Sequence, residues 1–136
     1  MLYFAYGSNL NMKAMEKMCP NAKRMLRVQL KDFKLTFNVY ADIVKEKGCK
    51  VYGALYKVSK EDILPLDEYE EYPKLYSKEN IIVEDENGDK YEAFAYTMVN
   101  KGVKDPEEKY YKIIEDGYKD WNITTEYLEE AKNRYR

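Results

Sequence analysis

Residues 76–98 read YSKENIIVEDENGDKYEAFAYTM, with two runs of alternating apolar and polar residues on either side of Asn87 and Gly88. Such alternation is typical of a strand, because successive side chains point to opposite faces of the sheet. Asn-Gly is the preferred pair for a two-residue hairpin turn, since both residues accept the positive φ that this turn requires. The stretch therefore predicts an antiparallel hairpin closed by a two-residue turn.

Four segments upstream of this hairpin also have the composition of strands. They are residues 2–6, 24–30, 32–39 and 50–58. Lys31 and Asp32 separate the second segment from the third, and a charged loop is expected before the fourth. The fourth segment is apolar on both faces, which is typical of a strand that is covered on both sides.

Two helices are predicted between these strands. The first runs from about Asn11 to Cys19 and ends at Pro20 and Asn21. Its spacing places three methionines inward, Met12, Met15 and Met18. The second begins after Ser59, which is the expected N-cap because Asp62 follows three residues later. Pro65 is expected to kink or restart this helix.

The C-terminal third has helical periodicity over residues 106–118 and 125–135. The side chains expected to face inward are Tyr110, Ile113 and Ile114 in the first helix, and Tyr127, Leu128 and Ala131 in the second. Strands thus dominate the first two thirds of the chain, and helices gather at its end. This segregation predicts an α+β fold with a curved or closed, mostly antiparallel sheet. The length of 136 residues suits a single domain over residues 1–136.

The composition is that of a globular protein, with 45% hydrophobic residues. Lys and Arg number 23 against 25 Asp and Glu, which argues against a nucleic-acid-binding protein with its basic surface. No apolar run has the length of a membrane span, and the first residues lack the features of a secretion signal. We therefore expect a cytoplasmic protein with no membrane or nucleic-acid partner, and two reduced thiols at Cys19 and Cys49.

The sequence contains no histidine. Ser-His and Cys-His nucleophile pairs and histidine metal sites are therefore excluded. Proton transfer near neutral pH must use a carboxylate, Tyr, Lys, Cys or the substrate itself. The two cysteines lie far apart in the sequence without ligand partners nearby, and no phosphate-binding loop is present. We expect no metal, nucleotide or other cofactor.

The segment Tyr6-Gly7-Ser8-Asn9-Leu10 joins the first predicted strand to the first predicted helix. Gly7 permits a positive φ and the close approach of a ligand. Successive backbone N–H groups in such a turn form an anion-binding site, to which the following helix adds a partial positive charge. Ser8 and Asn9 could cap the helix or bind a ligand. Spacing alone favours an ordinary capped turn, so both interpretations stay open at this point.

YFAYGSNL at residues 3–10 resembles the signature of the γ-glutamylcyclotransferase family, the group with a YGSN turn and an AIG2-like fold. Three further stretches are similar to that family: DFKLTF at residues 32–37, VYGALYKVSKEDILPLDEYEEYPKLY at 51–76, and YYKII at 110–114 followed by Gly117. The resemblance covers nearly the whole chain. It implies a small, mixed, mostly antiparallel β-barrel flanked by helices.

The resemblance also implies an enzyme without a cofactor, an acyltransferase or lyase acting on a small γ-glutamyl substrate. The substrate's own α-amine attacks its γ-carbonyl, and 5-oxoproline and an amine or amino acid are released. A tethered nucleophile of this kind reaches effective molarities of about 10⁵–10⁸ M, so few protein groups are needed. The family is compatible with a homodimer.

Four acidic residues follow Leu66 in the second helix: Asp67, Glu68, Glu70 and Glu71. Helical spacing puts Asp67 and Glu70 on one face and Glu68 and Glu71 on another, so geometry leaves the catalytic carboxylate undecided. The family's L-D-x-x-E pattern selects Glu70 as the general acid/base. A Glu stands at position 71, where many relatives have Gly.

The resemblance assigns the α-carboxylate end of the substrate to the turn. The substrate-binding residues that it implies are Tyr3, Tyr6, Gly7, Ser8, Asn9, Leu10, Tyr76 and Tyr110. Tyr111 is adjacent to Tyr110, so the register is uncertain by one residue. Two other functions stay open: the same reaction on a γ-glutamylamine, and a non-catalytic module that binds a small carboxylate.

Overall fold

The computed structural model describes residues 1–133. Five strands form a closed barrel in the order β1-β3-β2-β4-β5. Their bounds are β1 Leu2–Ala5, β2 Lys23–Asn38, β3 Tyr40–Lys57, β4 Tyr76–Glu84 and β5 Lys90–Met98. The helical elements are the short 3₁₀ turn η1 Ser8–Leu10 and the helices α1 Met12–Met18, α2 Lys60–Tyr69, α3 Glu108–Asp120 and α4 Glu126–Asn133. The predicted α+β class with a small barrel is confirmed.

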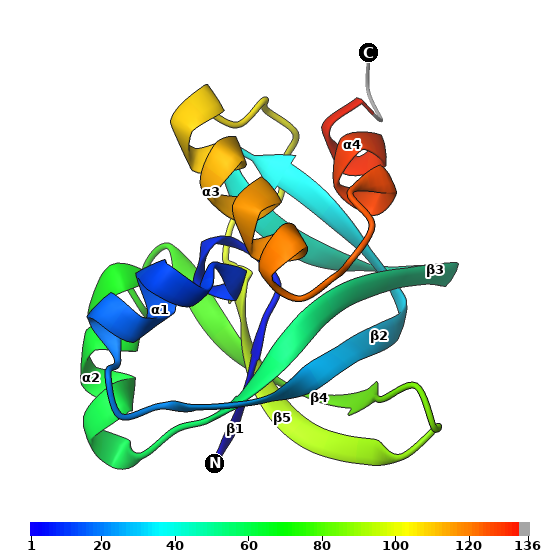
Figure 1. Ribbon diagram of the computed structural model, residues 1–136. Coiled ribbons are helices and arrows are strands. Elements are labelled where there is room, and N and C mark those ends of the chain that lie inside the picture. The colour runs from blue at the N-terminus through cyan, green and yellow to red at the C-terminus, as the bar shows by residue number, and fades with distance from the viewer. Residues whose placement is uncertain (134–136) are drawn as a thin grey trace.

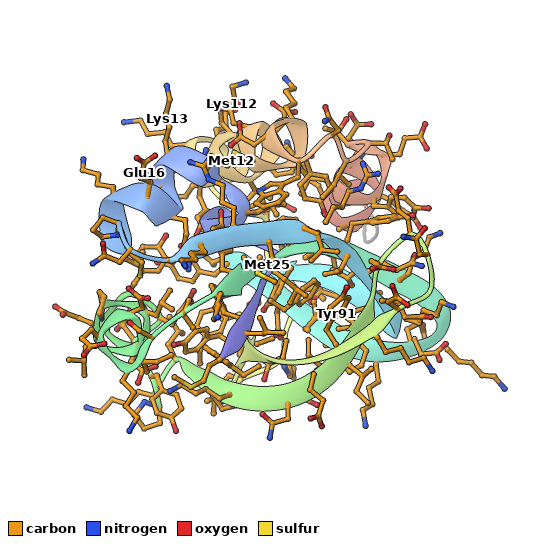
Figure 2. The ribbon with its side chains drawn as sticks, turned by 60° about the horizontal axis from the view of Figure 1, so that its bottom comes forward. Met12, Lys13, Glu16, Met25, Tyr91 and Lys112 are labelled. Carbon is orange, nitrogen blue, oxygen red and sulfur yellow. The ribbon has the colours of Figure 1, made fainter. Side chains whose placement is uncertain are left out.

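The helices lie outside the barrel, with α1 and α2 along one side and α3 and α4 at the top of the view in Figure 1. Figure 2 shows Lys13 on α1 and Lys112 on α3 projecting away from the barrel, and both side chains are exposed. All strand pairs are antiparallel except β1–β5, which pair in parallel where Tyr3 is opposite Phe94. Within the described residues, no helix has the length and apolar character required to cross a membrane.

Strands β4 and β5 form the predicted hairpin, with pairing from Tyr76–Met98 to Glu84–Lys90. The predicted two-residue turn is wrong, because five residues, 85–89, connect the strands. The Asp85 carboxylate accepts hydrogen bonds from the backbone N–H groups of Asn87 and Asp89 at 2.9 and 3.0 Å. An acidic side chain that holds the loop in this way stabilises a longer connection than the Asn-Gly pair predicts.

Strands β2 and β3 form one long hairpin, so the predicted break at Lys31 and Asp32 and the predicted charged loop before residue 50 are wrong. Asp32 sits instead at a bulge, with φ 62° and a register shift between Lys31 and Phe33. Its carboxylate accepts a hydrogen bond from Gly48 N at 3.0 Å. A bulge lets the strands bend while the pairing continues on either side. The charged residues Lys45, Glu46 and Lys47 of this hairpin remain in solvent.

The core is filled by apolar side chains from the barrel and by the inner faces of the helices. Phe4, Leu55 and Ile114 are completely buried. Gly53 permits the close approach of β1, since a Cβ there would lie 2.4 Å from the carbonyl oxygen of Ala5. The barrel therefore depends on the absence of a side chain at this position.

The predicted helices are confirmed, with changes in detail. In α1, Met15 is buried while Met12 and Met18 are half-buried. Ser59 and Asp62 form the expected capping box, and α2 continues through Pro65 as one helix.

The two C-terminal helices differ a little more from the prediction. Helix α3 begins at Glu108 rather than Pro106, and Ile113 is exposed because the inward face runs through Ile114 and Tyr118. Leu128 and Ala131 are buried in α4, as predicted. Tyr135, at the predicted end of the last helix, lies outside the described residues.

Candidate active site

A pocket lies where the turn after β1 meets the C-terminal end of α2 and the first part of α3. The pocket is small, and polar groups make up much of its lining. Its lining residues are Tyr3, Tyr6, Gly7, Ser8, Asn9, Ala41, Glu70, Tyr76, Tyr96 and Tyr110. The structure thus brings together all of the site residues predicted from the sequence except Leu10, which is completely buried beside the pocket.

The turn after β1 presents a compact backbone to the pocket. Leu10 N donates to Gly7 O at 3.1 Å, which uses one of the N–H groups expected to face a ligand. The first N–H groups of a helical turn, here those of Ser8 and Asn9, have no partner within the turn. Asn11, and not Ser8 or Asn9, caps α1 by accepting a hydrogen bond from Ala14 N at 3.0 Å. The side chains of Ser8 and Asn9 therefore remain for the pocket.

Gly7 is required for its small size rather than for its backbone conformation. Its φ is −111°, so the positive φ that glycine permits is not used here. A Cβ at this position would meet the Cβ of Ala41 at 3.2 Å and the Tyr110 hydroxyl at 3.7 Å. The absence of a side chain lets β3 and α3 close on the turn.

Glu70 ends α2 and directs its carboxyl group to the turn. Asn9 Nδ2 donates to Glu70 Oε1 at 3.4 Å and to the Tyr3 hydroxyl at 2.9 Å. Burial raises the pKa of Glu70 from 4.5 to about 8, because a carboxylate loses its hydration in the pocket. Glu70 is therefore a group that exchanges a proton close to neutral pH.

The other three acidic residues that follow Leu66 do not line the pocket. Asp67 accepts a hydrogen bond from the Tyr96 hydroxyl at 2.6 Å and forms an ion pair with Lys78 at 2.9 Å. Glu68 and Glu71 are exposed. Glu71 has a φ of 50°, in the left-handed region that glycine favours. Of the four carboxylates that helical spacing cannot rank, the tertiary structure thus brings only Glu70 to the pocket.

Tyrosines form most of the remaining wall, and two of them are attached to the same residue. The Tyr76 hydroxyl donates to Ala41 O at 2.6 Å, and Ala41 N donates to the Tyr110 hydroxyl at 2.9 Å. On the opposite wall, the Tyr6 hydroxyl donates to Tyr96 O at 2.6 Å. Burial raises the pKa of these phenols well above the usual value of 10, so they stay neutral. They provide shape and hydrogen bonds, and they do not act as bases at neutral pH.

The structure resolves the register of the late helix. Tyr110 lines the pocket, whereas the ring of Tyr111 packs 6.0 Å from that of Phe37.

The sequence prediction missed Ala41 and Tyr96. Ala41 lies in the segment predicted as a loop, and the alternation along β5 gives Tyr96 no distinction from its neighbours. Behind Ala41, the buried carboxylate of Asp42 pairs with Lys101 at 2.9 Å and accepts from Met98 N at 2.9 Å. This network ties β3 to the end of β5 and so fixes the position of Ala41.

One buried acceptor in the pocket is unsatisfied. Among the described residues, Asn9 Oδ1 has no hydrogen-bond partner although Asn9 is only 2% exposed. A buried acceptor of this kind costs about 1–3 kcal/mol unless a donor reaches it. The residue whose amide N–H contacts the Glu70 carboxyl group thus also carries an acceptor without a donor. Over residues 1–133, no cluster of Cys, Asp and Glu side chains is arranged to hold a metal ion.

The sequence of this chain is similar to known proteins over most of its length. Residues 3–122 match the family model described as gamma-glutamyl cyclotransferase, AIG2-like. The gamma-glutamylcyclotransferase of Homo sapiens is 31% identical over 96% of this chain and 77% of its own length.

Solved structures agree with this result. A structure named gamma-glutamyl cyclotransferase superposes with a TM-score of 0.86 at 30% identity, covering 98% of this chain and 86% of the other. An uncharacterized protein from Homo sapiens superposes with a TM-score of 0.85 at 31% identity, covering 97% of this chain and 86% of the other.

Proposed function

Since the chain belongs to the gamma-glutamyl cyclotransferase, AIG2-like family, we propose that it converts a small γ-glutamyl compound into 5-oxoproline and releases the attached amine or amino acid. The named homologues support an enzyme. One observation carries the proposal furthest. Glu70, with its raised pKa, and the turn residues Gly7, Ser8 and Asn9 line one pocket although they lie about sixty residues apart in the sequence.

The turn is the proposed binding site for the α-carboxylate of the glutamyl group. The N–H groups of Ser8 and Asn9 are the first of a helical turn, and such groups attract anions. Gly7 contributes no side chain that would fill this space. The neutral hydroxyls of the surrounding tyrosines add hydrogen-bonding capacity without adding charge.

The α-ammonium group of the substrate is proposed to lie between Asn9 and Glu70. It would donate to the unsatisfied Oδ1 of Asn9 and to the carboxylate of Glu70. The pKa of Glu70, about 8, is close to that of an α-amino group in peptides, also about 8. Proton transfer from the ammonium is therefore less unfavourable than it would be to a carboxylate with the unperturbed pKa of 4.5.

The reaction needs one carboxyl group. Glu70 accepts a proton from the α-ammonium, and the free amine attacks the γ-carbonyl carbon. A carbon–nitrogen bond forms in the five-membered ring, and the bond from the γ-carbon to the leaving nitrogen breaks. Glu70 returns its proton to the leaving nitrogen. The ring nitrogen loses its second proton as the lactam forms, and the released amine takes up one proton to become an ammonium, so that protons balance over the cycle. The tethered nucleophile accounts for about 7–11 kcal/mol of the barrier lowering, and one acid/base group supplies a further 10²–10⁴-fold.

A panel of γ-glutamyl amino acids and γ-glutamylamines tests this proposal. The purified chain is expected to release 5-oxoproline from at least one member, as measured by chromatography of the product. Turnover of the γ-glutamylamines alone would support the alternative substrate class. Binding of 5-oxoproline or glutamate without turnover of any member would contradict the proposal and indicate a carboxylate-binding module.

The pH dependence of the reaction follows from the ionisation of Glu70. The base form of the free enzyme is its carboxylate, and its pKa is about 8. We expect log(kcat/KM) to rise with a slope of about one as the pH increases toward 8, and to fall at higher pH, where the α-ammonium of the substrate has lost its proton. Initial rates between pH 5 and pH 9 measure this profile. A rate that is already constant from pH 5 upward would contradict the assignment of Glu70 as the base.

A further inference from the structure

Three tyrosines in the described residues are exposed, and each of them contacts a residue of the pocket. Tyr40, Tyr69 and Tyr72 are 42%, 48% and 40% exposed. None of the three lines the pocket itself, so each lies outside the lining, between the residue that it contacts and solvent. These three residues are called the aromatic rim below.

Tyr69 directly precedes Glu70 in the sequence. Its hydroxyl is 2.9 Å from Ser8 Oγ, in a hydrogen bond across the junction of α2 and the turn. The bond fixes the position of the ring while leaving almost half of the side chain in solvent. An exposed tyrosine without such a bond would move freely and would present no defined surface.

Tyr40 and Tyr72 are held by ring contacts. The ring of Tyr40 meets that of Tyr110 edge-on at 5.4 Å, and the ring of Tyr72 meets that of Tyr96 at 6.5 Å. Lys78 Nζ lies 4.4 Å from the centre of the Tyr72 ring. The rim is therefore assembled before any ligand arrives, which lowers the entropic cost of binding.

We infer that the aromatic rim binds the leaving group of the substrate and favours one with an aromatic or large apolar side chain. This inference rests on the proposed function and extends it to the substrate class. The pocket is small, and its polar turn and carboxyl group suit the glutamyl part of the substrate. The group attached to the γ-carbonyl would then extend from the pocket toward solvent, past the aromatic rim.

The rim distinguishes among leaving groups by contact area rather than by charge. The nearby cation Lys78 already forms an ion pair with Asp67 and covers the Tyr72 ring. The exposed ring surfaces of Tyr40 and Tyr69 remain for an apolar partner. Aromatic pairs of this kind change affinity by about two- to tenfold.

The experiment compares γ-glutamyl-phenylalanine with γ-glutamyl-alanine, which differ only in the side chain of the leaving group. We expect the wild-type chain to have the higher kcat/KM for the phenylalanine compound, by about two- to tenfold. Tyr69→Ala and Tyr40→Ala are expected to reduce this ratio toward one. Tyr69→Phe keeps the ring without its hydrogen bond and is expected to keep most of the ratio.

The matched control is Tyr91→Ala. Tyr91 lies on β5 beside the hairpin loop (Figure 2), where its hydroxyl donates to Asp85 at 3.1 Å, and it does not line the pocket. This variant is expected to keep the wild-type ratio.

A wild-type ratio at or below one, or a ratio that the rim variants leave unchanged, would overturn the inference while 5-oxoproline release continued. Release from neither compound nor from the wider panel would overturn the proposed function and the inference with it.

Discussion

Replacement of Glu70 by glutamine is expected to lower kcat/KM for 5-oxoproline release by about 10²–10⁴-fold, the usual contribution of one general acid/base group. Glutamine keeps the size of the side chain and its hydrogen bond with Asn9, but it cannot take or return a proton. Substrate binding is therefore expected to change by no more than a few-fold. Initial rates and calorimetric titration of the inactive variant with substrate separate the two effects.

The same variant gives an independent measure of burial. The Glu70 pKa is about 8 in the folded chain and 4.5 when unperturbed. Between these values the folded state keeps a proton that the unfolded state has released, so the stability of the wild type falls as the pH rises. Glutamine does not titrate. The melting temperature of Glu70→Gln relative to wild type is therefore expected to increase from pH 4.5 to pH 8.

Glu68→Gln is the matched control, since Glu68 is an exposed carboxylate on the same helix. It is expected to keep wild-type rates and show no comparable change in melting temperature with pH. Full turnover in Glu70→Gln would show that another group carries the proton. Equal losses in both variants would point to a general effect of charge on α2.

The replacement Gly117→Ala is expected to destabilise the fold, although alanine favours a helix by about 1 kcal/mol over glycine. Gly117 lies in α3 against the turn, and a Cβ there would come within 2.7 Å of Asn11 N and 2.8 Å of Leu10 C. Both neighbours are backbone atoms that cannot move aside without moving the turn. Overpacking of this kind costs about 1–3 kcal/mol or more.

An effect on activity is expected in addition to the effect on stability. Helix α3 also holds the turn through Trp121, whose ring N–H donates to Leu10 O at 2.9 Å. A displacement of about 1 Å at a reacting group costs about 10²-fold in rate. We expect Gly117→Ala to lower kcat/KM by about 10–10²-fold and the melting temperature by about 5–10 °C.

Lys109→Ala provides the comparison within α3, because Lys109 is exposed and does not line the pocket. Its melting temperature is expected to lie within about 2 °C of wild type, with unchanged rates. If Gly117→Ala melts at a higher temperature than wild type and turns over normally, the close contact between α3 and the turn has no functional importance. Thermal melts followed by circular dichroism and the 5-oxoproline assay provide both readouts.

Sequence patterns predicted helices and strands well where the interacting residues are close together in the chain. Ser59 and Asp62 form a capping box because their side chains and amides lie within one turn. The hairpin of β4 and β5 follows from alternation, yet its turn does not follow from Asn87 and Gly88. The Asp85 carboxylate, which accepts hydrogen bonds from the backbone N–H groups of Asn87 and Asp89, holds a longer loop instead.

The long hairpin of β2 and β3 shows a different limit. Charged residues and an Asp in the middle of an apolar run indicate a loop, because strands usually have one buried face. Here the pairing continues through the charged residues, which lie in solvent, and Asp32 is accommodated in a bulge. Beyond the bulge the hairpin again has buried apolar residues, Leu35, Phe37 and Ile43. The pairing of β2 with β3 depends on both segments at once, so the pattern of either segment alone does not predict it.

For the pocket, the sequence motif led to the turn and to Glu70, while residues such as Ala41 and Tyr96 became visible only in three dimensions. Ala41 serves through its backbone groups, which hold Tyr76 and Tyr110, and no side-chain pattern signals this. Tyr110 and Tyr111 are equivalent by composition. The direction of α3 against the barrel distinguishes them.

The sequence alone determined the fold class through its periodicity, the family through its motifs, and the absence of histidine chemistry through its composition. These are properties of short stretches of the chain or sums over its residues. The tertiary structure alone decided which of four neighbouring carboxylates is desolvated and which tyrosines meet around it. Desolvation depends on everything that surrounds a group, and the surroundings of Glu70 come from segments as distant as residues 3 and 110. Burial and proximity therefore arise only when the chain has closed on itself.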